Sequence, residues 1–216
     1  MIFTFASQKG GTGKTTLAIA FANYISETSK RTITVSDFDY QKSLYCKWKE
    51  DELSKSPIIY NVQTIGEDSE ELFADFETIL KLKENENMNL FDLAGTLDAR
   101  YIELLVYSDF IIIPFEYSDV SAKSTMVFIN FLGLIESQAK RVFIRSKYEK
   151  EYKYLNQTGM DKEIVRFGKL LQSPVFKRNS LETINTRKLT HFQKNAVREP
   201  FDELIKYINE TLKTTI

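Results

Sequence analysis

A glycine-rich loop near the start of the chain constrains its fold more than any other feature. Residues 7–16 read Ser-Gln-Lys-Gly-Gly-Thr-Gly-Lys-Thr-Thr and directly follow the apolar run 2–6. A short buried strand, such a loop and an amphipathic helix, in this order, direct backbone N–H groups at phosphate oxygens. Glycine lacks a Cβ and lets the backbone curl tightly, and the helix adds the positive end of its dipole. The pattern therefore predicts a phosphate-binding loop.

The polar side chains of the loop suit a nucleotide that carries magnesium. Lys14 would reach the β- and γ-phosphates, and the Thr15 hydroxyl would bind Mg²⁺. Gln8 stands where the plain pattern G-x-x-x-x-G-K-[ST] has its first glycine, and a second lysine, Lys9, follows it. An ordinary glycine turn does not explain two lysines and two threonines in register. The further nucleotide contacts are expected from Gly10, Gly11, Thr12, Gly13 and Thr16.

Strand and helix patterns alternate along the 216 residues. Apolar runs predict strands at 2–6, 32–36, 58–65, 89–93, 110–114 (ended by Pro114), 141–144 and 174–176. Stripes with a helical period predict helices at 13–28, 41–53, 67–83, 98–107 and 118–136, a mostly helical segment 148–171 with a break near Gly159, and a terminal helix that starts at Pro200. The alternation predicts a single α/β domain over residues 1–216, with a doubly wound, mostly parallel sheet and helices on both faces.

Three aspartates follow predicted strands at the carboxyl edge of this sheet, where such folds bind ligands. Asp92 ends an apolar strand, at the position of a carboxylate that holds Mg²⁺. Asp37 and Asp39 end the second strand, and because side chains alternate along an extended chain, both face the same side. Gly95 follows Asp92 closely, where backbone can approach the γ-phosphate. The alternative for each aspartate is a turn or a helix cap.

Composition and charge narrow the class of protein. No apolar run approaches the ~20 residues that span a bilayer, the N-terminus reads directly into a strand, and the single Cys46 and His191 form neither a disulfide nor a metal cluster, so we expect a cytoplasmic protein. Residues 1–137 contain 12 Lys and Arg against 21 Asp and Glu, whereas residues 138–216 contain 17 against 9. Such asymmetry is one indication of a nucleic-acid face, but charge alone favours the alternative, a solvated surface of mixed charge.

Two sequence elements point to a known family. The loop Lys-Gly-Gly-Thr-Gly-Lys-Thr at 9–15 resembles that of the ParA/MinD class of P-loop ATPases, and Asp37-Phe38-Asp39-Tyr40-Gln41 is similar to the Asp-x-Asp-Pro-Gln element of ParA proteins, with Tyr40 in place of proline. The order of elements and the length resemble the small ParF-like branch. The resemblance implies a P-loop NTPase fold and hydrolysis of ATP with Mg²⁺.

The resemblance also implies roles for particular residues. Lys14 stabilises the γ-phosphate, while Lys9 reaches the partner's nucleotide across an ATP-bound homodimer. Asp37 supports the Mg²⁺ that Thr15 and Asp92 hold, and Asp39 positions the attacking water. The segment 175–179 approaches the adenine ring, and Arg145 stands where many relatives carry Asn or Thr.

The same resemblance implies partners and a cellular role. The ATP-bound dimer would bind DNA without sequence preference through basic residues near the C-terminal end, for which the candidates are Arg178, Arg187 and Lys188. A small centromere-binding adaptor would stimulate an otherwise slow hydrolysis and release the dimer from the nucleoid. We therefore expect a plasmid partition ATPase that segregates DNA. The alternatives are a MinD-like membrane or cell-organisation ATPase and a metabolic P-loop ligase; a membrane is the less expected partner, because residues 202–213 mix acids and bases.

Overall fold

A parallel β-sheet organises the chain. The structure is a computed structural model that describes residues 1–29, 31–54, 56–64 and 76–213. Within these residues the sheet has seven strands in the order β3-β2-β4-β1-β5-β6-β7, and all of its pairings are parallel. The strands are β1 (Ile2–Phe5), β2 (Ile33–Phe38), β3 (Asn61–Thr64), β4 (Met88–Leu93), β5 (Phe110–Phe115), β6 (Lys140–Arg145) and β7 (Lys169–Leu170). The predicted doubly wound α/β fold is confirmed.

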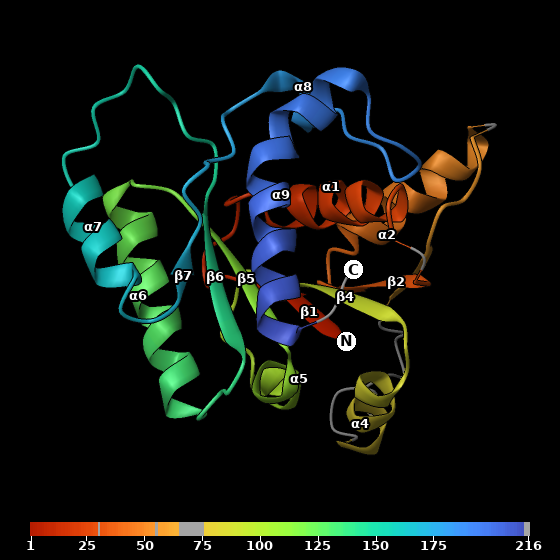
Figure 1. Cartoon of the computed structure of the whole chain (residues 1–216), viewed down its shortest axis with the longest axis horizontal. Coiled ribbons are helices and arrows are strands. Elements are labelled where there is room, and N and C mark those ends of the chain that lie inside the picture. Colours follow the sequence, from red (N-terminus) through yellow and green to blue (C-terminus); the bar gives the residue numbers. More distant parts are fainter. Residues whose placement is uncertain (30, 55, 65–75, 214–216) are drawn as a thin grey trace.

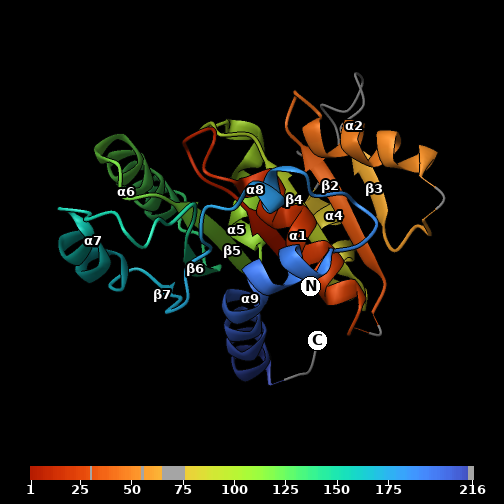
Figure 2. The same cartoon turned by 90° about the horizontal axis from the view of Figure 1, so that it is seen from above.

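Helices cover both faces of the sheet (Figures 1 and 2). Those on one face are α1 (Lys14–Ser26), α2 (Ser43–Glu50), α8 (Asn179–Glu182) and α9 (His191–Leu212). Those on the other are α4 (Phe76–Glu84), α5 (Ile102–Tyr107), α6 (Asp119–Leu134) and α7 (Gln157–Ile164). Short 3₁₀ turns follow α2 at Asp51–Leu53 and precede α5 at Ala99–Tyr101. Residues 65–75, which include the first part of the helix predicted at 67–83, lie outside the described residues.

The central strands are buried on both faces, which explains their unbroken apolar sequences. In β5, Phe110 and Ile112 face the core under α1 and α9, while Ile111 and Ile113 face the core under α5 and α6. All residues of β1, β4 and β5 are buried, whereas the edge strand β3 alternates between exposed and buried positions. The sheet therefore separates two hydrophobic cores.

Pro114 lies inside β5, paired with Ile144, and does not end the strand as predicted. The carbonyl of Ile112 accepts a hydrogen bond from the Ala6 amide, so Ile112 faces β1. Since alternate residues of a strand face the same neighbour, the Pro114 nitrogen points toward the side where β1 has already ended. The missing N–H removes no bond of the sheet, and proline is tolerated.

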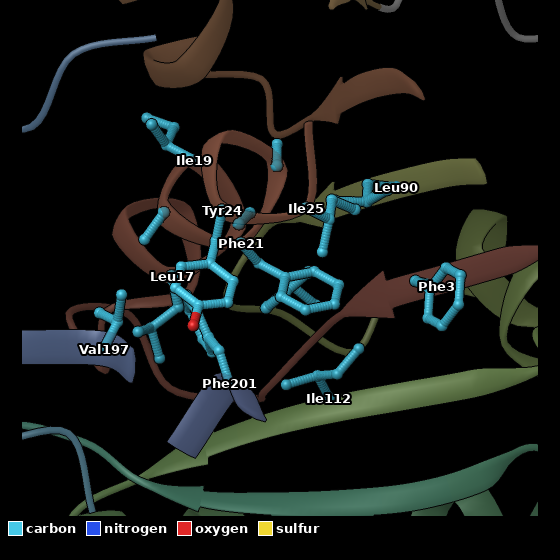
Figure 3. Packing of buried hydrophobic residues seen from close by; sticks show 14 of the residues in the cluster. Phe3, Leu17, Ile19, Phe21, Tyr24, Ile25, Leu90, Ile112, Val197 and Phe201 are labelled. Atoms are coloured by element: carbon cyan, nitrogen blue, oxygen red, sulfur yellow. The ribbon is translucent and has the colours of Figure 1, made fainter. Parts of the chain in front are cut away.

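An aromatic cluster anchors the helix that follows the glycine-rich loop (Figure 3). Phe21 of α1 packs edge-on against Phe201 of α9, with ring centroids 5.2 Å apart. The Tyr24 ring lies 5.6 Å from the Phe201 ring, and its hydroxyl donates a 2.6 Å hydrogen bond to Asp202. Both phenylalanines are fully buried. The C-terminal helix thus braces α1 from beside it, on the same face of the sheet.

The C-terminal third differs most from the prediction. Within residues 148–171, only α7 is an α-helix, and Gly159 lies inside it and does not break it. The last strand of the described sheet is β7, whereas the predicted strand 174–176 makes only an isolated bridge between Phe176 and Tyr148. The turn of helix at α8 was not predicted.

The terminal helix begins earlier than predicted. Pro200 lies in its interior, and the helix is capped by Thr190, whose side chain accepts from the Gln193 amide while the Gln193 side chain accepts from the Thr190 amide. This capping box satisfies two backbone donors that a helix start leaves free, and it outweighs the preference of proline for the first turn. No helix in the described part of the chain has both the length and the apolarity needed to cross a bilayer.

Removing the Phe201 ring should open a cavity between α1 and α9. We expect Phe201→Ala to lower the free energy of unfolding by about 3–5 kcal/mol. Phe192→Ala is the matched control, because Phe192 lies on the same helix and is 76% exposed; its effect should stay within about 0.5 kcal/mol. Urea unfolding followed by the fluorescence of the single tryptophan measures both, and equal losses would contradict this packing.

Candidate nucleotide-binding site

The glycine-rich loop connects the buried strand β1 to the start of α1. Gly11 and Gly13 adopt positive φ angles of 79° and 87°, which residues with a Cβ rarely adopt. The Ser7 hydroxyl lies 3.0 Å from the Thr12 hydroxyl and donates to the Lys9 carbonyl at 3.0 Å. These contacts close the loop into a compact turn in front of the helix N-terminus, where backbone N–H groups and the helix dipole favour an anion.

The two lysines of the loop lie in different surroundings. Lys14 is only 6% exposed, and its Nζ donates to the Lys9 carbonyl at 3.2 Å. Burial lowers the pKa of Lys14, and the charges of Asp92 and Asp39 oppose this shift. The Lys9 side chain is partly exposed. Gln8, the residue that departs from the plain motif, reaches α6 through a 3.4 Å contact with the Ser124 hydroxyl.

Asp92 is the last residue but one of β4 and lies beside both β1, which leads into the glycine-rich loop, and β2. It pairs in register with Phe5 of β1 and with Asp37 of β2, and it is 1% exposed. Burial raises the pKa of Asp92 to about 7, and the Asp37 charge adds to the rise, whereas the Thr15 hydroxyl and Lys14 lower it. In the described chain no donor meets hydrogen-bond geometry at either carboxylate oxygen. A buried carboxylate of this kind is costly unless a cation or donor approaches it.

This carboxylate is well placed for a magnesium ion bound together with phosphates. Mg²⁺ keeps several waters and takes only one or two protein carboxylates when phosphates supply the other ligands. The described residues contain no group of three or more His, Cys, Asp or Glu that would hold a metal by itself. The donor set of Asp92 and Thr15, with Asp37 beside it, therefore fits Mg²⁺ bound with a nucleotide better than an independent metal site.

Asp37 and Asp39 lie at the carboxyl end of β2, and their carboxylates are bonded to backbone amides. The fully buried Asp37 accepts from the Asp39 amide at 3.1 Å and from the Tyr45 amide at 2.9 Å. Burial raises the pKa of Asp37, although both of these amides counteract the rise. Asp39 accepts from the Gln41 amide at 2.9 Å. Both aspartates thus shape the turn into α2, which was the alternative interpretation, and the turn keeps them beside Asp92.

Gly95 packs against the back of the glycine-rich loop. A Cβ at this position would lie 2.7 Å from the Gly10 nitrogen and 3.0 Å from the Lys9 carbonyl carbon. The structure therefore gives Gly95 a packing reason to be glycine, in addition to the γ-phosphate contact that the sequence predicted. Gly13 is similarly close to the end of β6, since a Cβ there would lie 2.9 Å from the Ser146 Oγ.

A small cavity of about 120 Å³ lies beside the start of α1. Its walls include Thr16, Val175, Phe176 and Arg178, so the segment predicted to approach an adenine ring borders the phosphate loop. Arg145 lies elsewhere: its guanidinium bonds Asp161 at 2.9 Å and the Leu171 carbonyl at 2.7 Å. Its donors are engaged in holding α7 and the chain after β7.

Two further residues at this cavity were missed from the sequence. Ser146 and Lys147 follow β6 and line its wall, and the Lys147 ammonium donates to the Gly11 carbonyl. The signal that would have found them is their place directly after an apolar strand, at the ligand-binding edge of the sheet. Both also border an open cavity of about 790 Å³, whose walls include four tyrosines, Tyr117, Tyr148, Tyr152 and Tyr154.

The three basic residues predicted to bind DNA have different environments. Arg178 and Lys188 are exposed, and Arg178 lies over the Phe176 ring. Arg187 is only 3% exposed and donates to the carbonyls of Trp48 and Asp51. The prediction for Arg187 is therefore corrected: its guanidinium packs over the Trp48 ring inside the protein and is not offered to a phosphate at the surface.

A parallel sheet with a glycine-rich loop before its first helix, and with two buried aspartates at the same edge, defines a P-loop nucleotide-binding protein. The sequence model of the CobQ/CobB/MinD/ParA nucleotide binding domain matches residues 3–212. The chain belongs to this family of nucleotide-binding NTPases. No protein among curated sequences matches the chain.

Solved structures share the fold at low sequence identity. A protein from Borrelia burgdorferi B31 described as a plasmid partition protein, bound to AMPPNP, has a TM-score of 0.73 at 18% identity, over 97% of this chain and 98% of that one. McdA from Cyanothece has a TM-score of 0.74 at 16% identity, over 96% and 98%. The cell division ATPase MinD from Pyrococcus furiosus has a TM-score of 0.68 at 19% identity, over 95% and 98%.

The contact between Gly95 and the glycine-rich loop can be tested by adding one methyl group. Because the nearest atoms are backbone, we expect Gly95→Ala to lower the free energy of unfolding by about 1–3 kcal/mol and to weaken nucleotide binding. Gly133→Ala on α6 is the control, because no atom lies within 4 Å of a Cβ there; it should be neutral or stabilising by up to about 1 kcal/mol. Chemical denaturation and calorimetric titration with ATP report both effects, and a Gly95→Ala protein as stable as the control would refute the contact.

Proposed function

We propose that this protein is an ATP-dependent DNA partition ATPase. The observation that carries the nucleotide chemistry is the buried Asp92 carboxylate, which lies beside Asp37 and Lys14 without a hydrogen-bond donor of its own in the described chain. A site that collects a desolvated carboxylate, a buried lysine and a glycine-rich loop is suited to a polyphosphate with a divalent cation. Membership of the ParA/MinD family supports ATP as that ligand.

The residues divide the work of hydrolysis between binding and positioning. The loop amides from Gly10 to Thr16 and the Lys14 ammonium would hold the phosphates, while Thr15 and Asp92, supported by Asp37, would hold Mg²⁺, which neutralises charge on the phosphates when it is bound. Asp39 would accept a hydrogen bond from the attacking water and orient it. The protein needs no covalent step, because positioning and electrostatic stabilisation account for most of phosphoryl-transfer catalysis.

Lys9 connects the chemistry to assembly. It is a partly exposed lysine at the outer turn of the loop, whereas Lys14 is buried within it. We propose that Lys9 reaches the nucleotide of a second copy of the chain, so that ATP joins two copies face to face. Charge supplied across such an interface acts like an arginine finger, and it would make hydrolysis depend on the dimer.

The distribution of charge along the chain supports DNA as the binding partner. The excess of basic residues lies in 138–216, and Arg178 and Lys188 are exposed there. Contacts with phosphates alone would bind DNA without sequence preference and with strong dependence on salt. A small adaptor bound at a centromere-like site would stimulate hydrolysis and release the dimer, which would place the protein in the cytoplasm and, with ATP, on the nucleoid.

The second candidate function is that of a MinD-like ATPase that binds a lipid surface, because the fold is similar to that of MinD. The C-terminal helix argues for the first candidate, because its acidic side chains hold it to the core: Asp202 accepts from Tyr24, and Glu203 accepts from the amides of Gln172 and Ser173. A membrane-binding helix needs an apolar face that is free to leave the protein, whereas the apolar face of α9 is buried.

Replacing Asp39 should separate binding from hydrolysis. We expect Asp39→Ala to bind ATP as the parent does and to hydrolyse it about a hundredfold more slowly, because the group that orients water is lost. Steady-state phosphate release and calorimetric titration measure the two steps. Lys14→Ala is the comparison, since it should lose binding itself. Parent-like hydrolysis by Asp39→Ala would exclude the assigned role.

Binding to a long non-specific DNA duplex tests the function as a whole. We expect binding with ATP but not with ADP or without nucleotide, and a steep loss of affinity between 50 and 200 mM salt, as phosphate contacts require. Lys9→Ala should bind ATP as a monomer and fail to bind DNA. Arg178→Ala and Lys188→Ala should each reduce the salt slope by about one, whereas the exposed Lys206→Ala should not. Binding to anionic vesicles in place of DNA would favour the MinD-like role.

A further inference from the structure

The two loops that carry the aspartates are joined by Tyr40, Arg100 and Tyr101. Tyr40 lies in the turn after β2, between Asp39 and α2, and Arg100 and Tyr101 lie in the 3₁₀ turn that follows Gly95. The Arg100 guanidinium carbon is 4.5 Å from the centre of the Tyr40 ring. The Tyr101 hydroxyl donates a 2.6 Å hydrogen bond to the Phe38 carbonyl. We refer to these three side chains as the tyrosine–arginine clamp.

The arginine of the clamp is held in a fixed orientation. Asp98 caps the 3₁₀ turn by accepting from the Arg100 amide at 3.0 Å, and its two carboxylate oxygens accept from Nε and Nη2 of the same arginine. A guanidinium that donates from two of its three nitrogens to one carboxylate cannot rotate freely. Its face is therefore presented to the Tyr40 ring, which is 53% exposed.

The buried tyrosine of the clamp acts from the inside. Tyr101 is 2% exposed, and the carbonyl that its hydroxyl bonds belongs to Phe38, the residue between Asp37 and Asp39. Burial raises the pKa of Tyr101 to about 12, although a hydrogen bond from the Ala94 amide opposes the rise. The hydroxyl therefore remains a neutral donor at physiological pH. Through Phe38 and Ala94, one side chain contacts the chain beside all three site aspartates.

The Asp39 backbone carbonyl accepts from the Lys42 amide at 2.8 Å, but the side chains of both aspartates hold this turn through carboxylate oxygens that face the proposed ligand. Asp39 bonds the Gln41 amide, and Asp37 bonds the Asp39 and Tyr45 amides. If the Asp39 carboxylate turns toward a water, the turn loses the Gln41 bond. The clamp contacts the same turn through the Phe38 carbonyl and the Tyr40 ring, which do not depend on either carboxylate.

We propose that the tyrosine–arginine clamp positions Asp39 for hydrolysis by holding the turn after β2 against the loop after β4. Tyr40 and Arg100 hold the turn from the outside and Tyr101 from the inside; none of the three is a catalytic residue. Tyr40 thereby takes over, by stacking, the stiffness that a proline would give to the chain. This inference rests on the proposed hydrolysis of ATP, but the clamp itself is testable without it.

The first test compares Tyr40→Ser with Tyr40→Phe by hydrogen exchange of the amides in residues 38–44. Tyr40→Ser removes the ring, so exchange should rise about two- to fivefold, as expected for loss of an exposed cation–π contact. Tyr40→Phe keeps the ring and should retain the parent rate. Tyr152→Ser, at a tyrosine that is 64% exposed elsewhere, is the control. Equal exchange in Tyr40→Ser and the parent would overturn the clamp, whether or not the protein hydrolyses ATP.

The second test measures kcat and KM for ATP hydrolysis, which report whether the clamp positions Asp39. Tyr40→Ser and Arg100→Gln should each lower kcat several-fold with little change in KM, and the double variant should be no slower than the slower single variant, because both remove one contact. Tyr101→Phe should lower kcat by about tenfold or more, since a small displacement of a positioned group is costly. Faster exchange with unchanged kcat, or additive losses in the double variant, would overturn the positioning role. A parent protein that binds but never hydrolyses ATP would instead refute the proposed function, while hydrogen exchange would still decide whether the clamp exists.

Discussion

The parallel pairing of β2, β4 and β1 is the constraint on which the rest of the molecule depends. Phe5, Asp92 and Asp37 lie side by side in register, so the glycine-rich loop and the two buried aspartates leave the sheet at one edge. Parallel strands must be buried on both faces and connected through helices, which explains why two separate hydrophobic cores surround a polar site. The same burial makes an unsatisfied carboxylate at Asp92 costly, which favours the approach of a cation or a hydrogen-bond donor there.

The precision of the glycine-rich loop comes from the helix behind it. A loop with two positive-φ glycines has little structure of its own, but α1 is fixed by Phe21 and Tyr24 against Phe201 of the C-terminal helix. That helix is in turn held by carboxylates, since Glu203 bonds the chain after β7 and pairs with Lys169. The charged residues of α9 that face the protein thus work as anchors, whereas Arg178 and Lys188, which precede this helix, are exposed.

Local sequence predicted the sheet and the phosphate loop because their signals are local: apolar runs, a helical period, and glycines at fixed spacing. Prediction from local sequence failed where contacts between distant parts of the chain determine the local structure. Pro114 is tolerated because β1 has already ended beside it, Arg187 is buried because Trp48 and the Asp51 carbonyl receive it, and residues 148–156 are irregular because tyrosines pack on one another around an open cavity. The capping box at Thr190 was readable from the sequence and is a stronger helix start than Pro200. The contacts that Gly95, Lys147 and Tyr101 make could not be read from local sequence, since their partners are 63 to 136 residues away.

The charged side chains of the site differ in their hydrogen-bond partners, and this difference suggests how a bound nucleotide would rearrange these side chains. Lys14 and Lys147 donate to carbonyls of the glycine-rich loop itself, and Asp39 accepts from an amide two residues along its own turn. Each of these bonds can be exchanged for a bond to phosphate or water without leaving a buried polar group unpaired. Asp92 has no such local bond to lose in the described chain, and its buried position fixes where positive charge must lie. With the proposed ligand bound, the lysines would adapt to the phosphate, whereas Asp92 would set the location of the cation. The remaining freedom would lie in the turn that carries Asp39. A contact that fixes this turn from outside the site, as Tyr40 and Arg100 do, acts on an element whose geometry the sheet does not determine.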